Sequence, residues 1–184
     1  VMGKLFMVLP LHFGFETAVD GRIERIVDNL AEVKPTFMAS APRVFEKAYN
    51  GVEAAMVDKG GVTEKLYRWA VEKGGTVFDA DHGVGHASAF TRWQAKLGDR
   101  IVLSKVRERF GGRARFFISG SAALNPEIGR WFGAVGMPVL EGYGLTESSA
   151  GTCLTQPTQY RPGYVGRPLN GLEAKVDSDG ELLL

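Results

Sequence analysis

The chain has 184 residues, of which 45% are hydrophobic and 23% are charged, as in an ordinary soluble globular domain. This length and composition argue against a disordered chain, a repeat array or a small disulfide scaffold. The 22 basic and 21 acidic side chains leave a net charge of +1, which gives no general attraction to nucleic acid or to an anionic membrane. Glycine is in excess, with 24 residues, and predicts tight turns or close backbone approaches.

The N-terminal part of the chain is predicted to be mainly helical. Residues 1–15 are apolar but too short and too interrupted to cross a bilayer, so we expect a buried strand or helix that enters a core. Asp20 is expected to cap a helix that ends at Pro35. Residues 36–39 are apolar and predict a short strand.

The next part of the chain is predicted to be helical with one break. A helix is expected to begin at Pro42 and to end at Gly60 and Gly61, and a third helix follows it. Residues 74–88 contain a glycine pair and several polar side chains, which indicates a surface connection. Apolar residues at helical spacing between 97 and 110 predict one more helix.

The clearest pattern is a strand, a helix and a second strand. Residues 114–118 predict the first strand, Asn125 and Pro126 the capped start of the helix, and residues 138–140 the second strand. Such a crossover is normally right-handed and parallel. The loops that follow the two strands should therefore leave the same edge of one sheet, where open α/β folds bind ligands.

Beyond about residue 150 the pattern changes. Short segments at 164–166 and 174–176 alternate with glycine, proline and aspartate, and they predict β-hairpins. We therefore expect an α/β fold, with a layered sheet and flanking helices, followed by the start of a β-rich part.

One of the two loops at the predicted sheet edge carries side chains suited to a nucleotide. Tyr143 lies between Gly142 and Gly144, so a planar base can stack on its ring. Thr146 can donate a hydrogen bond to a phosphate oxygen, and Glu147 can bind Mg²⁺. The alternative is a tight turn in which the tyrosine packs on the core and the glutamate is solvated.

The other loop, at residues 119–123, consists of serine, glycine and alanine, and its backbone can approach the edge of an adenine. Tight packing between a strand and a helix would select the same small residues. Neither serine of this loop lies in the GxSxG motif of hydrolases, and no GxGxxG dinucleotide fingerprint is completed in the chain.

A histidine and aspartate cluster offers a competing metal site. His82 and His86 lie four residues apart, beside Asp79 and Asp81. The glycines between the histidines weaken the helix that would set the geometry, so we expect a solvated loop.

Four longer strings are more specific than these short signals. They are LEGYGLTESSAG, preceded by FISGSAALNPEIGRWF and followed by GYVGRPLNGLEAKVDSDGELLL, and KPTFMASAPRVFEKAYNGV near the start. Together they closely resemble the adenylate-forming enzymes, and specifically the long-chain fatty-acid–CoA ligases. The resemblance covers essentially the whole chain.

The resemblance implies a two-step reaction that uses ATP, Mg²⁺ and coenzyme A. A fatty acid and ATP give an acyl-adenylate and pyrophosphate, and coenzyme A then displaces AMP to give the acyl-CoA. The implied site residues are Gly120, Ser121, Ala122 and Tyr143 for the adenine, Thr146 for the α-phosphate, Glu147 for Mg²⁺, and Glu141, Gly142 and Gly144 for the rest of the nucleotide-binding loop. Thr146 and Glu147 are the implied catalytic residues.

The resemblance also implies a domain division and a location. Residues 1–142 would be an α/β subdomain, and residues 143–184 the motif loop and the beginning of a β-rich subdomain. The family's phosphate-binding loop, an upstream histidine, the ribose-binding aspartate and the catalytic lysine have no counterpart here, so we expect an internal fragment that is inactive alone. The expected location is cytoplasmic, with long-chain fatty acid and CoA as partners, no nucleic acid, and peripheral membrane contact left open.

Two alternatives to this function stay open. One is a non-catalytic nucleotide-binding module, and the other is an adenylating enzyme for an aryl or amino acid.

Overall fold

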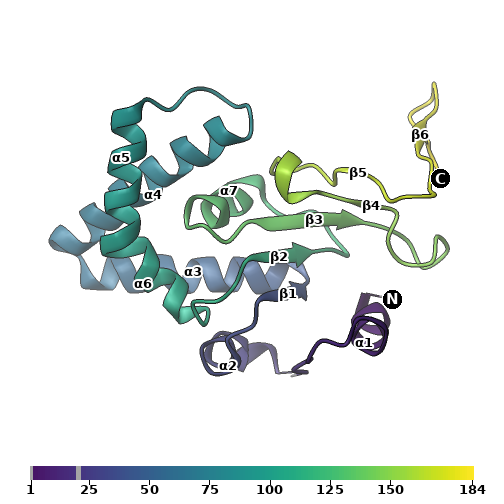
Figure 1. Ribbon diagram of the computed structural model, residues 1–184, viewed down its shortest axis with the longest axis horizontal. Coiled ribbons are helices and arrows are strands. Elements are labelled where there is room, and N and C mark those ends of the chain that lie inside the picture. The colour runs from purple at the N-terminus through teal and green to yellow at the C-terminus, as the bar shows by residue number, and fades with distance from the viewer. Residues whose placement is uncertain (1, 20–21) are drawn as a thin grey trace.

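The computed structural model describes residues 2–19 and 22–184 and contains a five-stranded mixed sheet flanked by helices (Figure 1). Its strands, in spatial order, are β1 (Phe37–Ser40), β2 (Phe116–Ser119), β3 (Val139–Tyr143), β4 (Cys153–Leu154) and β5 (Arg167–Pro168). The first three run parallel, and β4 and β5 add antiparallel strands. The expected α/β class is confirmed.

Helices make up most of the rest. They are α1 (Met2–Phe13), α2 (Ile26–Val33) after the 3₁₀ turn η1 (Ile23–Arg25), α3 (Pro42–Lys59), α4 (Gly61–Asp81), α5 (Ala89–Gly98), the π-helical turn η2 (Asp99–Leu103), α6 (Ser104–Arg109), α7 (Pro126–Ala134) and the 3₁₀ turn η3 (Pro157–Gln159). The two-stranded hairpin of β6 (Lys175–Val176) and β7 (Leu182–Leu183) ends the chain and extends away from the sheet (Figure 1).

The predicted crossover is present as β2, α7 and β3. The Asn125 side chain accepts a hydrogen bond from the Glu127 N–H at 2.9 Å, and Pro126 opens the helix, as the sequence predicts. Strands β2 and β3 pair in parallel, with Ser119 opposite Glu141. Both strands therefore end at the same edge of the sheet.

An aromatic core fixes this crossover in place. The rings of Phe45, Phe110, Phe117 and Phe132 are at most 1% exposed. Five pairs among them have centroids 5.7 to 6.2 Å apart, and all five are tilted or edge-to-face. Because these residues come from α3, the end of α6, β2 and α7, one cluster packs three helices against strand β2.

The expected surface connection at 74–88 is wrong over its first half, because α4 continues to Asp81. Its glycine pair serves helix packing: a Cβ on Gly74 would lie 2.5 Å from the Ala134 carbonyl oxygen, and one on Gly75 would lie 2.9 Å from Arg130. Gly74 thus allows a close approach to the backbone of α7, and Gly75 leaves room for the Arg130 side chain of the same helix. The glycine excess is partly explained by such contacts.

The N-terminal segment is helical but not buried. Among the described side chains of α1, Met7, Val8, Leu11 and Phe13 are between 60% and 86% exposed. The expected burial of residues 1–15 is therefore wrong for this part of the chain, since no described element covers these side chains. Asp20, the expected helix cap, lies outside the described residues.

The C-terminal part forms hairpins, but at shifted positions. Strand β3 is longer than residues 138–140, because Gly142 and Tyr143 pair with Leu154 and Cys153 of β4. Residues 164–166 are not a strand, and the pairing begins at Arg167. The sheet thus continues from the parallel strands directly into the antiparallel ones.

Candidate nucleotide site

The two candidate loops leave neighbouring strands at one edge of the sheet. In the β2–β3 register, Ser119 pairs with Glu141, so Ser121 and Tyr143 each lie two residues further along parallel neighbours. A Cβ on Gly142 would lie 3.8 Å from the Ser119 carbonyl oxygen, which shows how closely the two backbones approach. The convergence of the loops that the sequence predicts is confirmed.

The first loop is anchored at its start and exposed at its tip. Gly120 is buried, and its N–H donates to the Ser40 carbonyl at 3.3 Å, which ties the loop to β1. Ser121, Ala122 and Ala123 are exposed. Ser121 has a φ of 72°, in the left-handed region where a side chain costs about 1–2 kcal/mol. The loop therefore presents its backbone rather than large side chains to solvent.

The Ser121 backbone gives a prediction about stability. Ser121→Val is expected to lower the free energy of unfolding by about 1–2 kcal/mol, because a β-branched residue fits poorly at positive φ. Ser121→Gly relieves strain but loses about 0.5–1 kcal/mol to chain entropy, so it should change stability little or raise it. Urea denaturation of the two variants tests this, and equal stability of both would contradict the backbone argument.

The second loop is a compact turn closed by its own hydrogen bonds. The Ala150 N–H donates to the Leu145 carbonyl at 3.0 Å, and the Leu145 N–H donates to Ser148 Oγ at 3.1 Å. Ser148 Oγ also lies 2.8 Å from Thr152 Oγ1, which joins the turn to the start of β4. Gly144 is required here, since a Cβ on it would lie 1.7 Å from the Ala150 carbonyl oxygen.

The tip of this turn carries Thr146 and Glu147, and both residues are exposed. Within residues 2–19 and 22–184, neither side chain has a hydrogen-bond or ion-pair partner. Tyr143, at the end of β3, is half-buried. A ring, a hydroxyl and an unpaired carboxylate are thus available beside the small-residue loop.

Glu141 differs from the other residues of the predicted nucleotide set, because its side chain is only 5% exposed. Its carboxylate accepts backbone N–H groups from Gly163 at 2.7 Å and from Leu124 at 3.3 Å. Tyr160 lies near it, and burial, followed by the charge of Glu141, raises the Tyr160 pKa above its usual range. Tyr160 therefore stays a neutral donor, to the Gly129 carbonyl at 3.3 Å.

Two further buried groups lie near the sheet edge, Ser119 of the first loop and the lone Cys153. Ser119 Oγ is buried and has no hydrogen-bond partner in the described part of the chain. The Cys153 side chain is buried opposite Tyr143, and this burial raises the pKa of its thiol. The raised pKa makes this cysteine a poor nucleophile.

The competing histidine and aspartate cluster does not form a metal site. Asp79 pairs with Arg130 at 2.6 Å, and Asp81 pairs with Arg92 at 2.7 Å. His82 Nδ1 lies 2.7 Å from the Phe78 carbonyl. Among the described residues, no group of three metal-binding side chains comes together.

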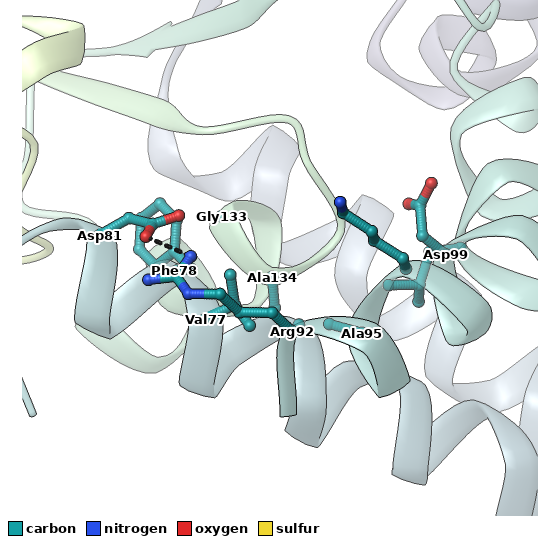
Figure 2. Close-up of a pocket in the computed structure, with 11 residues that line it drawn as sticks. Val77, Phe78, Asp81, Arg92, Ala95, Asp99, Gly133 and Ala134 are labelled. Atoms are coloured by element: carbon teal, nitrogen blue, oxygen red, sulfur yellow. Dashed lines mark ion pairs between the residues drawn. The ribbon is translucent and has the colours of Figure 1, made fainter. Parts of the chain in front are cut away.

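A cavity of about 510 Å³ lies elsewhere, between α4, α5 and α7 (Figure 2). Figure 2 shows the Asp81–Arg92 ion pair at one end of it and Asp99 at the other. Small residues such as Ala95, Gly133 and Ala134 contribute to its lining. The cavity lies at the C-terminal end of α7, whereas the 119–123 loop precedes the N-terminal end of this helix. None of the predicted site residues lines the cavity.

The chain is similar in sequence to known proteins. The chain is 32% identical over 186 aligned positions to the long-chain-fatty-acid–CoA ligase FadD15 of Mycobacterium bovis, an alignment that covers all of this chain and 30% of that protein. It is 32% identical to long chain acyl-CoA synthetase 3 of Arabidopsis thaliana, over 88% of this chain and 24% of that protein. The chain thus spans about a third or less of the length of these relatives.

A solved structure, that of the anthranilate CoA ligase AuaEII in complex with anthranoyl-AMP, is similar with a TM-score of 0.48 and 20% identity, over 88% of this chain and 22% of that one. The family model for AMP-binding enzymes matches residues 1–183. The chain therefore belongs to the family of AMP-binding enzymes.

Proposed function

We propose that this chain forms one wall of the ATP and acyl-adenylate site in a long-chain fatty-acid–CoA ligase. The parallel register of β2 and β3 carries the proposal, because it brings the 119–123 loop and the 144–150 turn to one edge of the sheet. The names of the aligned relatives, which are long-chain acyl-CoA ligases and synthetases, support the choice of substrate class.

The proposed reaction has two steps. The fatty-acid carboxylate attacks the α-phosphate of ATP, so that a carboxyl–phosphate bond forms and pyrophosphate leaves. The thiol of coenzyme A then attacks the acyl carbonyl, and AMP leaves. Both steps develop negative charge on oxygen, which preorganised donors can stabilise.

Each loop has a distinct task in this proposal. Tyr143 stacks on the adenine, and the backbone of Gly120, Ser121 and Ala122 lies along the adenine edge. Thr146 donates its hydroxyl to the α-phosphate. Gly142 and Gly144 keep the backbone open beside the nucleotide, and Glu141 precedes them on β3.

The donor set also fits Mg²⁺. Protein Mg²⁺ sites often use only one or two carboxylates, with waters and substrate phosphates as the other ligands. The exposed, unpartnered carboxylate of Glu147, one residue from Thr146, meets that requirement. When bound, the ion would neutralise charge on the phosphates.

Binding of an adenylate mimic tests the site. Titration calorimetry with a non-hydrolysable acyl-adenosine sulfamate is expected to show Tyr143→Ala binding about 5- to 150-fold more weakly than the wild-type chain, the equivalent of about 1–3 kcal/mol of stacking. Tyr143→Phe keeps the ring and should bind nearly as well. Equal affinity of Tyr143→Ala and wild type would remove the stacking role.

The same titration separates the alternative functions. Aryl and aminoacyl sulfamates that bind more tightly than the long-chain compound would favour another acid. A non-catalytic nucleotide-binding module would be favoured by a different pair of results: the chain binds the adenylate mimic, but a full-length enzyme that contains the chain activates no acid.

We further propose peripheral membrane contact through the outer face of α5 and η2. Within the described chain, no helix is long and apolar enough to span a bilayer. Four exposed apolar residues follow one helical stripe: Phe90, Trp93, Leu97 and Ile101. Lys96 and Arg100 are exposed beside them. An apolar stripe with adjacent cations suits an anionic lipid surface.

Sedimentation with vesicles tests this contact. Vesicles of phosphatidylcholine with phosphatidylglycerol are expected to bind the chain more tightly than pure phosphatidylcholine. Lys96→Glu should weaken this binding about fivefold or more, since one cation near the surface contributes about 1 kcal/mol. Lys65→Glu makes the same charge reversal at an exposed position of α4 and is the control. Equal sedimentation of all variants would contradict the contact.

We also propose that the chain divides into an α/β part at 1–142 and a β-rich part that begins at 143. A second proposal is a cytoplasmic location. The change from parallel to antiparallel pairing after β3 supports the division. The single, buried, unpaired Cys153 suits a reducing compartment.

A further inference from the structure

Glu141 combines a buried charge with a fixed position beside the proposed site. It lies on β3 opposite Ser119, two residues before Tyr143, and is 5% exposed. A buried carboxylate is costly unless hydrogen bonds compensate it. Both of its oxygens have a partner, and both partners are backbone N–H groups.

One partner fixes the first candidate loop. Glu141 Oε2 accepts the Leu124 N–H at 3.3 Å, just before the Asn125 cap of α7. The other end of the loop is held by the bond from the Gly120 N–H to the Ser40 carbonyl. The exposed residues 121–123 thus lie between two residues that are held by hydrogen bonds, Gly120 by β1 and Leu124 by Glu141.

The other partner fixes a turn from the antiparallel region. Glu141 Oε1 accepts the Gly163 N–H at 2.7 Å. This turn lies against the first turn of α7, since a Cβ on Gly163 would lie 3.1 Å from Pro126 Cγ. Thr155 Oγ1 donates to the Tyr164 carbonyl at 2.6 Å and holds the turn to the sheet.

We infer that Glu141 is a positioning residue that clamps the 120–124 loop and the 160–164 turn to the end of β3, and that it acts on the nucleotide only through them. The inference rests on the proposed function for the site itself. It revises the place of Glu141 in the nucleotide-binding set, because both carboxylate oxygens are directed at the protein's own amides. Charge-assisted hydrogen bonds of this kind are stronger than neutral ones, so the clamp holds the 120–124 loop at a set distance from Tyr143.

Amide hydrogen exchange measured by NMR on the chain reads the clamp directly. In Glu141→Ala, exchange at the Leu124 and Gly163 amides is expected to accelerate about tenfold or more. In Glu141→Gln only one of the two should accelerate, because the amide side chain keeps one acceptor oxygen. The Thr155 N–H bonds the backbone carbonyl of Glu141 at 2.9 Å and should stay unchanged, which separates loss of the clamp from general loosening.

The functional readout is the Kd for the acyl-adenosine sulfamate, with the KM for ATP in a full-length enzyme. Glu141→Gln is expected to raise both about fivefold or more while kcat stays within about twofold, because the loop is displaced but the reacting groups are intact. Glu127→Gln changes an exposed glutamate in the first turn of α7 and should alter neither measurement.

Three outcomes would overturn the inference in distinguishable ways. Unchanged exchange at Leu124 and Gly163 in Glu141→Ala would show that no clamp exists. Accelerated exchange with normal sulfamate affinity would show a clamp without a positioning role. A wild-type chain that does not bind the sulfamate would overturn the proposed function and the positioning role together, even where the exchange result is as expected.

Discussion

Replacing Gly144 by alanine is expected to disable the proposed site. The new Cβ would lie 1.7 Å from the Ala150 carbonyl oxygen, whereas carbon and oxygen atoms not bonded to each other stay about 3.3 Å apart. Ala150 must therefore move by more than an ångström, which breaks its bond to the Leu145 carbonyl and opens the turn that carries Thr146 and Glu147. A displacement of that size can reduce a rate about 100-fold.

The measurement is adenylation by a full-length enzyme carrying the change, together with sulfamate binding by the chain. Gly151→Ala is the matched control: it adds the same methyl at the other end of the same loop, where the nearest atom would be a Leu169 methyl carbon at 3.5 Å. That variant should bind and react normally. Normal adenylation in Gly144→Ala would show that the turn does not need its observed shape.

The elements that could be predicted from the sequence are those fixed by local signals. Asn125, Pro126 and the apolar residues after them define α7 within a few positions, because capping and periodicity act over one or two turns. The parallel pairing of β2 and β3 follows from the short crossover between them. The meeting of the 119–123 loop with Tyr143 could therefore be predicted without any long-range information.

The elements that could not be predicted depend on distant partners. Gly74 and Gly75 normally weaken a helix, but here they allow α7 to approach α4, which a pattern within residues 74–88 does not reveal. Strand β3 is extended to Tyr143 only because β4 returns beside it. The apolar residues of α1 predict burial, yet Met7, Val8, Leu11 and Phe13 are exposed.

The candidate site also has features that the sequence predicts and features that depend on distant residues. Residue types alone indicate what Tyr143, Thr146 and Glu147 can bind, because their chemistry is carried by single side chains. The environment of Glu141 is set by the amides of Leu124 and Gly163, which are 17 and 22 residues away along the chain. From the sequence alone, a glutamate beside a glycine-rich loop is predicted to bind a ligand. Only the folded structure shows that its carboxylate accepts these two backbone amides.

Replacing Glu147 by glutamine in a full-length enzyme is expected to slow adenylation about 100-fold or more. The change removes one negative charge and leaves the size of the side chain nearly the same. Metal-assisted charge stabilisation contributes several kcal/mol, and each 1.4 kcal/mol or so is a factor of about ten in rate. Stability should not change, because the Glu147 side chain is exposed and has no partner among the described residues.

A Mg²⁺ titration separates this role from a general effect of charge. Glu147→Gln should need a higher Mg²⁺ concentration for half-maximal adenylation, whereas Tyr143→Ala should not. Glu173→Gln removes the same charge from an exposed position near the C-terminal hairpin and should react like the wild type. If Glu147→Gln kept the wild-type rate and the wild-type Mg²⁺ dependence, the carboxylate would not be a metal ligand, and Thr146 and Tyr143 would have to account for phosphate and base binding without it.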